Sequence, residues 1–447
     1  MATEVNAKEH MLRDLGGGLI LRRATAGDTE ALAAFNCEIH CSRDPADERR
    51  RMKAWIEELM SGKHPTVKPG DFTIVEDTGA GAIVSSLCLI SQTWSYGGVK
   101  FGLGQPELVG TKPDHRRRGL VRAQFEVVHE WSAQRGHKAQ AISGIPNFYR
   151  QFGYEMALEM HGGRAGYASD APKLKKGEKE PYRVRAATRA DLPFISRVYA
   201  RGMKRYLVSC VRDAALWQNE LEGHGTMSVQ KRALLVIESA AGARVGFLVH
   251  GTRLWGQMLG VSVYELKRGV SWLAATPSVM RYLVRTGERY AAREKKQFAS
   301  FALELGSEHP AYQVAPERLP RSREPYAFYL RVADLAGFLR HIKPVLERRI
   351  GDSVAVDYTG ELKLNFYRAG VRIAFEKGRL AEIEPWAPGE GQCAAFPDHT
   401  FLHLLFGHRS LEELRLSYRD CFATSDEARV LLGVLFPKMP SVVWGLA

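Results

Sequence analysis

The sequence predicts a mixed α/β protein of three successive domains. Two observations indicate this: the opening of the first domain recurs about 160 residues later, and a run of strands separated by glycines follows near the C-terminal end. The length agrees, since 447 residues correspond to about three domains of ~150 residues each. Apolar residues make up 45% of the chain, which is enough to give each domain a core.

The first domain opens with a strand over Leu19–Arg23, followed by a short turn and a helix near Thr29–His40. We expect Asp28 to cap this helix, because its carboxylate can accept hydrogen bonds from the N–H groups of the first turn. A strand, a polar turn and a capped helix in this order are typical of an α/β unit.

The second domain is predicted by a repeat of that opening. Arg-x-Ala-Thr-x-x-Asp occurs at Arg22–Asp28 and again at Arg185–Asp191, after a short strand over Tyr182–Arg185 and before a helical pattern. A Lys/Gly/Pro-rich stretch at about 166–181 has the composition of a solvated linker between the two copies.

The most informative stretch of the first domain is an Arg/Gly turn. The strand Glu107–Thr111 ends at Pro113, which cannot donate a sheet hydrogen bond, and an amphipathic helix follows over Val121–Gln134. Between them Arg116–Arg118 precede Gly119, where the backbone can approach a ligand closely. Three arginines alone are more often a solvated turn, but the flanking strand and helix favour an anion site for pyrophosphate.

This stretch resembles the acetyl-CoA-binding segment of GNAT-type N-acetyltransferases, whose core pattern is Arg/Gln-x-x-Gly-x-Gly/Ala. Arg116, Gly119 and Val121 occupy its three fixed positions. A bulky aliphatic residue after Gly-Leu, as at Val121, is closer to the Eis-type (enhanced intracellular survival) branch. The resemblance implies two tandem GNAT-like mixed-sheet domains and acetyl-CoA as co-substrate. The implied cofactor-binding residues are Val109, Thr111, Arg116, Arg117, Arg118, Gly119, Leu120 and Val121.

A second segment, Ile145–Tyr154, resembles the Phe/Ile-Tyr-x-x-Phe-Gly-Tyr/Phe segment that closes the transferase domain in the same family. There a strand splays from its neighbour to admit the acyl-pantetheine arm, and the tyrosine protonates the departing thiolate. The resemblance gives this role to Tyr149, and a phenol with a pKa near ~10 can perform it. The competing interpretation is an aromatic core patch of Phe148, Tyr149, Phe152 and Tyr154.

The second copy lacks a corresponding cofactor turn. Its long helix is preceded by Trp272–Arg281, which contains no Arg-x-x-Gly, and Pro277 with Ser278 predicts an ordinary helix start. We therefore expect the second domain to have a structural role and to shape the substrate pocket.

The third domain begins near Tyr326 and leads into a helix through about Arg349. Four strands are predicted next, at Val354–Tyr358, Glu361–Tyr367, Val371–Glu376 and Arg379–Glu384, and then a short helix within 398–407. This order resembles a sterol carrier protein type 2-like α+β domain, which Eis-type proteins carry at this end. His399, His403 and His408 suggest a metal, but without acidic or cysteine partners in register we expect surface or capping histidines.

The predicted domains are thus 19–165, 182–325 and 326–447, and the tail carries a candidate base. Phe436–Ala447 is apolar, whereas free tails are usually polar, so we expect it to pack through Trp444. In the Eis-type family the tail threads into the first domain, where its terminal carboxylate takes the proton of the amine through water. That group would be the α-carboxylate of Ala447. Glu107, on the strand that enters the Arg/Gly turn, is the competing base, and the other interpretations of Glu107 are a solvated strand residue or an ion-pair partner.

Composition limits the alternatives. A net charge of +13 and a pI near 9.4 would suit a nucleic-acid binder, but no zinc-finger spacing or RNA-binding aromatic motif accompanies them. The six cysteines form no C-x-x-C pair, so we expect reduced thiols and no metal. Neither a signal peptide nor a run of ~18 apolar residues is evident, which predicts a cytoplasmic protein without a membrane partner.

The predicted activity is direct acetyl transfer from acetyl-CoA to an amine, such as an aminoglycoside, a polyamine or a lysine-like acceptor. A cationic acceptor would be attracted by carboxylates, for which Glu38, Asp44, Asp47 and Glu48 are candidates. The resemblance also implies a homo-oligomer, a hexamer in that branch. The alternative function is a non-catalytic sensor that binds acetyl-CoA or an apolar ligand.

Overall fold

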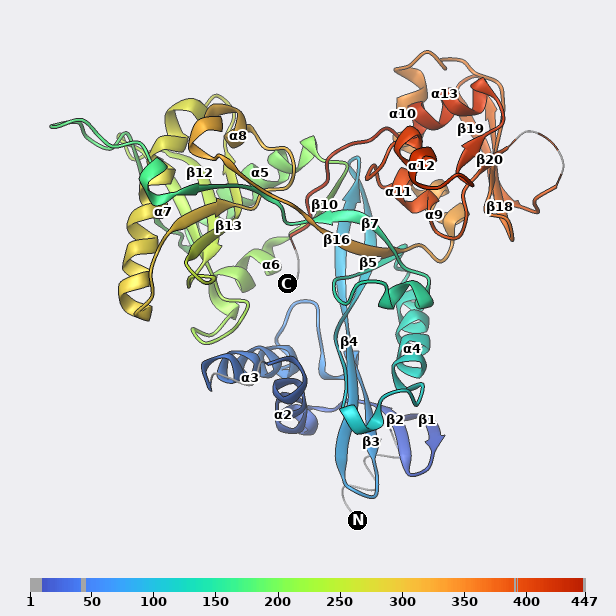
Figure 1. Cartoon of the computed structure of the whole chain (residues 1–447), viewed down its shortest axis with the longest axis horizontal. Coiled ribbons are helices and arrows are strands. Elements are labelled where there is room, and N and C mark those ends of the chain that lie inside the picture. The colour runs from blue at the N-terminus through green and yellow to red at the C-terminus, as the bar shows by residue number, and fades with distance from the viewer. Residues whose placement is uncertain (1–9, 42–45, 390, 392, 445–447) are drawn as a thin grey trace.

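A computed structural model describes residues 10–41, 46–389, 391 and 393–444, whose strands form three sheets of nine, seven and five strands (Figure 1). In the view of Figure 1 the nine-stranded sheet runs vertically through the centre, the seven-stranded sheet lies to its left, and the five-stranded sheet lies at the upper right. The mixed α/β class predicted from the sequence is confirmed.

The first sheet is covered by helices on both faces. Helix α2 (Thr29–His40) and α3 (Ala46–Met60) lie on one face, and α4 (Leu120–Gln134) lies on the other (Figure 1). Its strands, in spatial order, are β1 (Met11–Gly16), β2 (Leu19–Arg23), β3 (Phe72–Asp77), β4 (Ala82–Tyr96), β5 (Val99–Thr111), β6 (Ala139–Ile142), β16 (Tyr326–Arg331) and β7 (Glu155–Met160), with β10 (Val208–Cys210) also paired to β4. Successive residues alternate between the two cores: Ile74 packs with the α2 and α3 side, and Val75 with α4.

The second sheet repeats this plan. Its strands, in spatial order, are β9 (Tyr182–Ala186), β11 (Arg232–Ser239), β12 (Arg244–Gly251), β13 (Met258–Leu266), β14 (Ser300–Leu303), β8 (Gly163–Tyr167) and β15 (Arg321–Arg323). The helices of this unit are α5 (Leu192–Gly202), α6 (Ala214–Gln218), α7 (Trp272–Glu294) and α8 (Pro310–Val314). Among the described strands of the second sheet, β13 and β14 are the one parallel pair of neighbours. The first sheet likewise has one such pair, β5 and β6.

The two sheets exchange a strand. Strand β8 follows β7 in the chain but pairs with β14 and β15 of the second sheet. Strand β16 follows β15 but lies between β6 and β7 of the first sheet. The expected ranges 19–165 and 326–447 therefore do not coincide with the sheets, because β8 and β16 each complete the sheet of another unit.

The sequence repeat corresponds to one hydrogen-bonded turn made twice. In the first copy Arg22 Nη2 lies 2.7 Å from Asp28 Oδ1, and Thr25 N donates to Asp28 Oδ2 at 2.7 Å. In the second copy Arg185 Nη1 and Thr188 N bind Asp191 Oδ2 at 2.7 and 2.9 Å. Asp28 is the N-cap residue of α2, as expected, but its side chain makes no capping hydrogen bond to the helix, because its carboxylate is occupied by the arginine and the threonine.

Helix α7 also begins earlier than predicted. Its N-cap is Ser271, whose side chain accepts a hydrogen bond from Ala274 N at 3.2 Å, and Pro277 lies inside the helix. The proline was an ambiguous signal, because proline favours the first turn but can be accommodated further in when packing holds the helix.

The third unit has a five-stranded sheet. The strands, in spatial order, are β19 (Arg379–Trp386), β18 (Gly370–Glu376), β17 (Gly360–Asn365), β20 (Ala394–Ala395) and β21 (Phe422–Ala423). Its helices are α9 (Leu335–His341), α10 (Lys343–Gly351), α11 (Phe401–Leu405), α12 (Leu411–Ser417) and α13 (Asp426–Leu435). The strand expected at Val354–Tyr358 is a turn, where Val354 is 86% exposed and Asp357 has a φ of 57°.

One core joins the third unit to the first sheet. It includes Trp94 and Leu103 of the first sheet, Phe328 of the exchanged strand β16, and Phe338 and Leu339 of α9. The third unit therefore packs on the first sheet rather than hanging from a linker. Within the described part of the chain, no helix combines the length and apolar character needed to cross a bilayer.

Candidate functional site

Strand β5 separates from its parallel neighbour halfway along its length. It pairs with β6 only at Leu103–Ala139 and Gly104–Gln140, although it continues to Thr111. Pro106 follows the last paired residue closely and has no N–H to continue a ladder. On its other edge β5 stays paired with β4 but contains a bulge, where Leu108 has a φ of 55°. The splayed strand expected from the second segment is thus present.

The Arg/Gly turn lies at the end of β5. Gly119 is the N-cap of α4, with a φ of 76° and no capping side chain, so the first N–H groups of the helix remain available to a ligand. Arg117 also has a left-handed backbone, with a φ of 62°, and Arg116–Arg118 are exposed. Helix start and guanidinium groups together form a site suited to an anion.

The corresponding helix start in the second unit, that of α7, is not open to a ligand. There Ser271 occupies the N-cap of α7 and its hydroxyl already accepts a first-turn N–H. Trp272, the first residue of the helix, packs on Tyr264 and His309 with ring centroids 4.9 and 5.0 Å apart. Side chains therefore fill the helix start that is open in α4.

Tyr149 lies in the 3₁₀ turn Phe148–Phe152, at the inner end of the splayed region. Its side chain is only 4% exposed and its ring packs on Phe125 and Tyr329. Gly144 makes room for it, since a Cβ there would lie 2.8 Å from Tyr149 Cε2. Burial raises the pKa of the Tyr149 hydroxyl, so the group stays protonated at neutral pH. The aromatic patch and the candidate acid are therefore the same cluster.

Glu107 lies on β5 immediately before the bulge. Its carboxylate accepts a hydrogen bond from Gln105 Nε2 at 3.2 Å. Burial raises the pKa of Glu107 to about 7, against the opposing effect of that hydrogen bond. The carboxylate is near enough to Tyr149 to raise the pKa of its hydroxyl further. A carboxyl group that titrates near neutrality and a phenol that stays protonated thus lie close together.

The apolar tail packs, as the sequence predicts, and its described residues contact the segment 207–217. Leu207 N donates to Pro440 O at 2.8 Å, and Val442 N donates to Val208 O at 3.0 Å. Trp444 is buried against Trp217, and the guanidinium of Arg212 lies 3.9 Å from the centre of its ring. Ala447, whose carboxylate was the first candidate base, lies outside the described residues.

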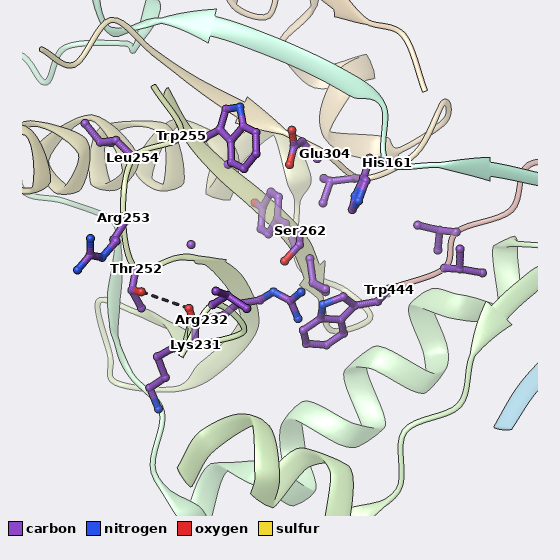
Figure 2. Close-up of a pocket in the computed structure, with 18 of the residues that line it drawn as sticks. His161, Lys231, Arg232, Thr252, Arg253, Leu254, Trp255, Ser262, Glu304 and Trp444 are labelled. Carbon is purple, nitrogen blue, oxygen red and sulfur yellow. Dashed lines mark hydrogen bonds between the residues drawn. The ribbon is translucent and has the colours of Figure 1, made fainter. Parts of the chain in front are cut away.

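Sequence reasoning missed a cavity of about 640 Å³ between α3, the second sheet and the tail. Trp255, which is 84% exposed, lies on the far side of it from Trp444, and the Arg232 side chain lies beside the Trp444 indole (Figure 2). Ser262 of β13 and Glu304 also line it. Because the lining comes from eight separate stretches of chain, no local pattern in the sequence could indicate it.

The four expected acceptor carboxylates lie in different surroundings. Glu38 is paired with Lys112 at 3.4 Å, and Asp47 is paired with Arg253 across the cavity wall. Glu48 lines the cavity with Asp47. Asp44 lies outside the described residues.

Of the three histidines considered for a metal, His403 is buried and His408 is half-buried. His403 is 7% exposed, and its Nδ1 lies 2.9 Å from Nδ1 of His408, while its Nε2 faces Glu155 at 3.6 Å. The expectation of surface or capping histidines is wrong for this pair, because α11 packs on β7 of the first sheet. No group of three or more His, Cys, Asp or Glu side chains among the described residues is arranged to hold a metal.

A family model described as an acetyltransferase (GNAT) domain matches residues 21–157. Residues 21–157 form a GNAT acetyltransferase domain. The match includes most of β2, β3 to β6, the Arg/Gly turn, Glu107 and Tyr149. The cavity, the tail and Tyr329 lie outside it, apart from Asp47, Glu48 and Arg51 of the cavity wall. The chain is accordingly an N-acetyltransferase, with acetyl-CoA as its co-substrate.

Solved structures share the fold of nearly the whole chain. A probable N-acyltransferase from Enterococcus faecalis is 13% identical with a TM-score of 0.68, covering 95% of this chain and 98% of its own. A GCN5-related N-acetyltransferase from Kribbella flavida is 16% identical with a TM-score of 0.62, covering 95% and 97%. Eis1 from Mycobacterium abscessus is 12% identical with a TM-score of 0.59, covering 94% and 97%. No curated protein matches the sequence.

Proposed function

We propose that this acetyltransferase belongs to the Eis-type branch and transfers acetyl directly from acetyl-CoA to the amine nitrogen of a small acceptor or a lysine side chain. One observation carries the proposal. The open start of α4, the separation of β5 from β6, Glu107 and Tyr149 all lie in one unit of the chain, whereas the corresponding helix start of the second unit is filled.

In this proposal acetyl-CoA lies along the separated half of β5. The backbone of Val109 and Thr111 orients the pantetheine arm and polarises the thioester carbonyl. The turn from Arg116 to Val121 holds the pyrophosphate through backbone N–H groups and guanidinium donors. The positive φ at Arg117 and Gly119 supports this arrangement, because it turns successive N–H groups toward one side.

The chemistry requires one base and one acid. The neutral amine attacks the thioester carbonyl, the new C–N bond forms, and the C–S bond then breaks. Glu107 accepts the proton of the amine through water, and Tyr149 donates its hydroxyl proton to the departing CoA sulfur. The shifted pKa values of the two groups support this division of roles. The Ala447 carboxylate is the second candidate base.

The cavity beside α3 supports a small-molecule acceptor, since 640 Å³ falls in the usual range for such sites, ~300–1,000 Å³. The exposed ring of Trp255 is suited to an amine such as an aminoglycoside or polyamine. The branch also implies a sterol carrier type 2-like third domain and a hexameric assembly.

The test is a measurement of CoA thiol release from acetyl-CoA against a panel of aminoglycosides, polyamines and lysine peptides, with acetylated product identified by mass spectrometry. We expect amine-dependent release with at least one of these classes. Tight acetyl-CoA binding without acetylation of any amine would instead support a non-catalytic sensor.

A further inference from the structure

Three hydrogen bonds link four side chains in a row, from Trp94 in the core to the carboxylate of Glu107. Trp94 Nε1 lies 2.7 Å from Gln92 Oε1, Gln92 Nε2 lies 2.8 Å from Gln105 Oε1, and Gln105 Nε2 lies 3.2 Å from Glu107 Oε2. The four residues lie on the adjacent strands β4 and β5, which are antiparallel. They alternate along each strand, so all four side chains can lie on one face of the sheet.

The chemistry of these groups permits only one direction of hydrogen bonding. The indole N–H of Trp94 is a donor and never an acceptor, so the Gln92 oxygen must face it. The Gln92 NH₂ group must then donate to the Gln105 oxygen, which leaves the Gln105 NH₂ group to donate to Glu107. A glutamine alone could present either its oxygen or its nitrogen to a carboxyl group. Here the tryptophan at the far end determines which one Glu107 meets.

The far end of this chain is held rigidly. Trp94 is fully buried and packs against Phe328 of the exchanged strand β16, with ring centroids 6.0 Å apart. It belongs to the core that the first sheet shares with α9 of the third unit. Gln105 is also buried, at 1% exposure, so its amide cannot turn to find partners in water. The donor that faces Glu107 is therefore set by residues far from the reaction.

We propose that Gln105, Gln92 and Trp94 act as positioning residues that keep the Glu107 side chain oriented and favour its carboxylate form, which makes it an effective base. This inference rests on the proposed role of Glu107. It extends that role by linking the base, through Trp94, to the strand and helix that the C-terminal part of the chain contributes.

Among the described residues no charged side chain shifts the pKa of Glu107. Asp71 and Arg135, which act on the neighbouring Cys88, are paired with each other. The titratable groups that face this region are Tyr149 of the 3₁₀ turn, Cys88 of β4 and His40 at the end of α2. Burial raises the pKa of Tyr149 and Cys88 and lowers that of His40, so all three are uncharged at neutral pH. The amide of Gln105 and the backbone of Leu108 are the two donors that oppose the effect of burial on Glu107.

The test is the pH dependence of kcat/KM for acetyl transfer by the full chain, between pH 5.5 and 9. Trp94→Phe keeps an aromatic ring in the core but removes the indole N–H that fixes the direction of the chain, and Gln105→Met keeps the length of the side chain but removes the amide. We expect each to move the acidic limb of the profile up by about one pH unit, because a carboxylate that loses a donor becomes harder to ionise. Gln92→Met breaks the same chain one residue nearer to Glu107 and should move the limb by a similar amount.

Thr93→Val is the matched control, since Thr93 lies between Gln92 and Trp94 but its side chain is exposed; its profile should be unchanged. Melting temperatures and acetyl-CoA affinity are measured on every variant, so that a loss of structure is seen directly.

Glu107→Gln separates the positioning proposal from the proposed function. If the profile of Glu107→Gln retains the acidic limb, Glu107 is not the base, and both proposals fail. If Glu107→Gln removes the limb while the limb of Trp94→Phe and Gln105→Met stays at the wild-type pH, only the positioning role is overturned.

Discussion

At the scale of single residues, the site depends on two groups whose pKa values are moved in useful directions by burial. Glu107 has its pKa raised to about 7, which lets it exist as a carboxylate at neutral pH and still accept and release a proton. Tyr149 has its pKa raised above the ordinary tyrosine value, so it remains a donor. The sequence could suggest both residues by resemblance, but it could not show their burial or the amide beside Glu107.

Glu107 should also carry a stability cost that depends on pH. Its folded-state pKa is raised above the ordinary value of 4.5, so the folded state disfavours the charged form that the unfolded chain adopts above pH 4.5. That cost is absent at low pH and grows as the pH rises toward the folded pKa. We expect Glu107→Gln to raise the melting temperature at pH 8 by a few degrees and to leave it unchanged at pH 4.

The measurement is thermal unfolding of the wild type and Glu107→Gln across this pH range, with Glu30→Gln on the exposed face of α2 as control. Equal melting temperatures of the wild type and Glu107→Gln at pH 8 would mean that the carboxylate is not held in an unfavourable environment.

At the scale of secondary-structure elements, the two units that share the Arg-x-Ala-Thr-x-x-Asp turn differ at the start of a later helix. Helix α4 begins after Gly119 and offers free N–H groups to a ligand, whereas α7 begins after Ser271, which occupies them itself. The loss of the Arg-x-x-Gly turn could be read from the sequence. The bounds of α2 and α4 were also predictable from their apolar periodicity, but the start of α7 was not, because Pro277 gave a misleading signal.

Variants of the two helix starts should therefore behave differently. Replacing Arg117 and Arg118 together by alanine should raise the KM for acetyl-CoA at least tenfold with little change in kcat, since each guanidinium contributes binding to an anion that does not react. Ser271→Ala in α7 should leave that KM unchanged and lower the stability by about 1 kcal/mol through loss of the cap.

Steady-state kinetics with acetyl-CoA varied at two salt concentrations checks this pair. Screening of the charges should weaken binding in the wild type more than in the double variant. A KM that responds to Ser271→Ala as strongly as to the arginine variant would indicate a cofactor site in the second unit.

At the scale of the whole molecule, the strand exchange makes the first unit dependent on the rest of the chain. Strand β16 supplies Tyr329, which packs on Tyr149, and Tyr326, whose hydroxyl donates to Gly144 O at 2.6 Å. The wall of the candidate site is therefore completed by residues more than 150 positions away in sequence. Such long-range pairing leaves no local pattern, which is why neither the exchange nor the cavity beside α3 could be predicted from the sequence.

This arrangement predicts that the first unit does not fold by itself. A fragment of residues 1–161 lacks β16 and should expose the edges of β6 and β7, so we expect it to aggregate. Extending the fragment to include the second unit without 326–447 should not rescue it, whereas co-expression with a fragment of residues 162–447, which keeps β8 whole, should yield a soluble, active complex. A soluble monomeric 1–161 fragment that binds acetyl-CoA would contradict this dependence.

The central claim is that one transfer site, formed in the first unit around Glu107 and Tyr149, acetylates amines. It is tested most directly by the turnover of Tyr149→Phe, which removes only the hydroxyl from a buried ring. We predict acetyl-CoA affinity equal to that of the wild type and a kcat lower by about 10²–10⁴-fold, the usual contribution of a positioned acid. Unchanged turnover in Tyr149→Phe would contradict the account.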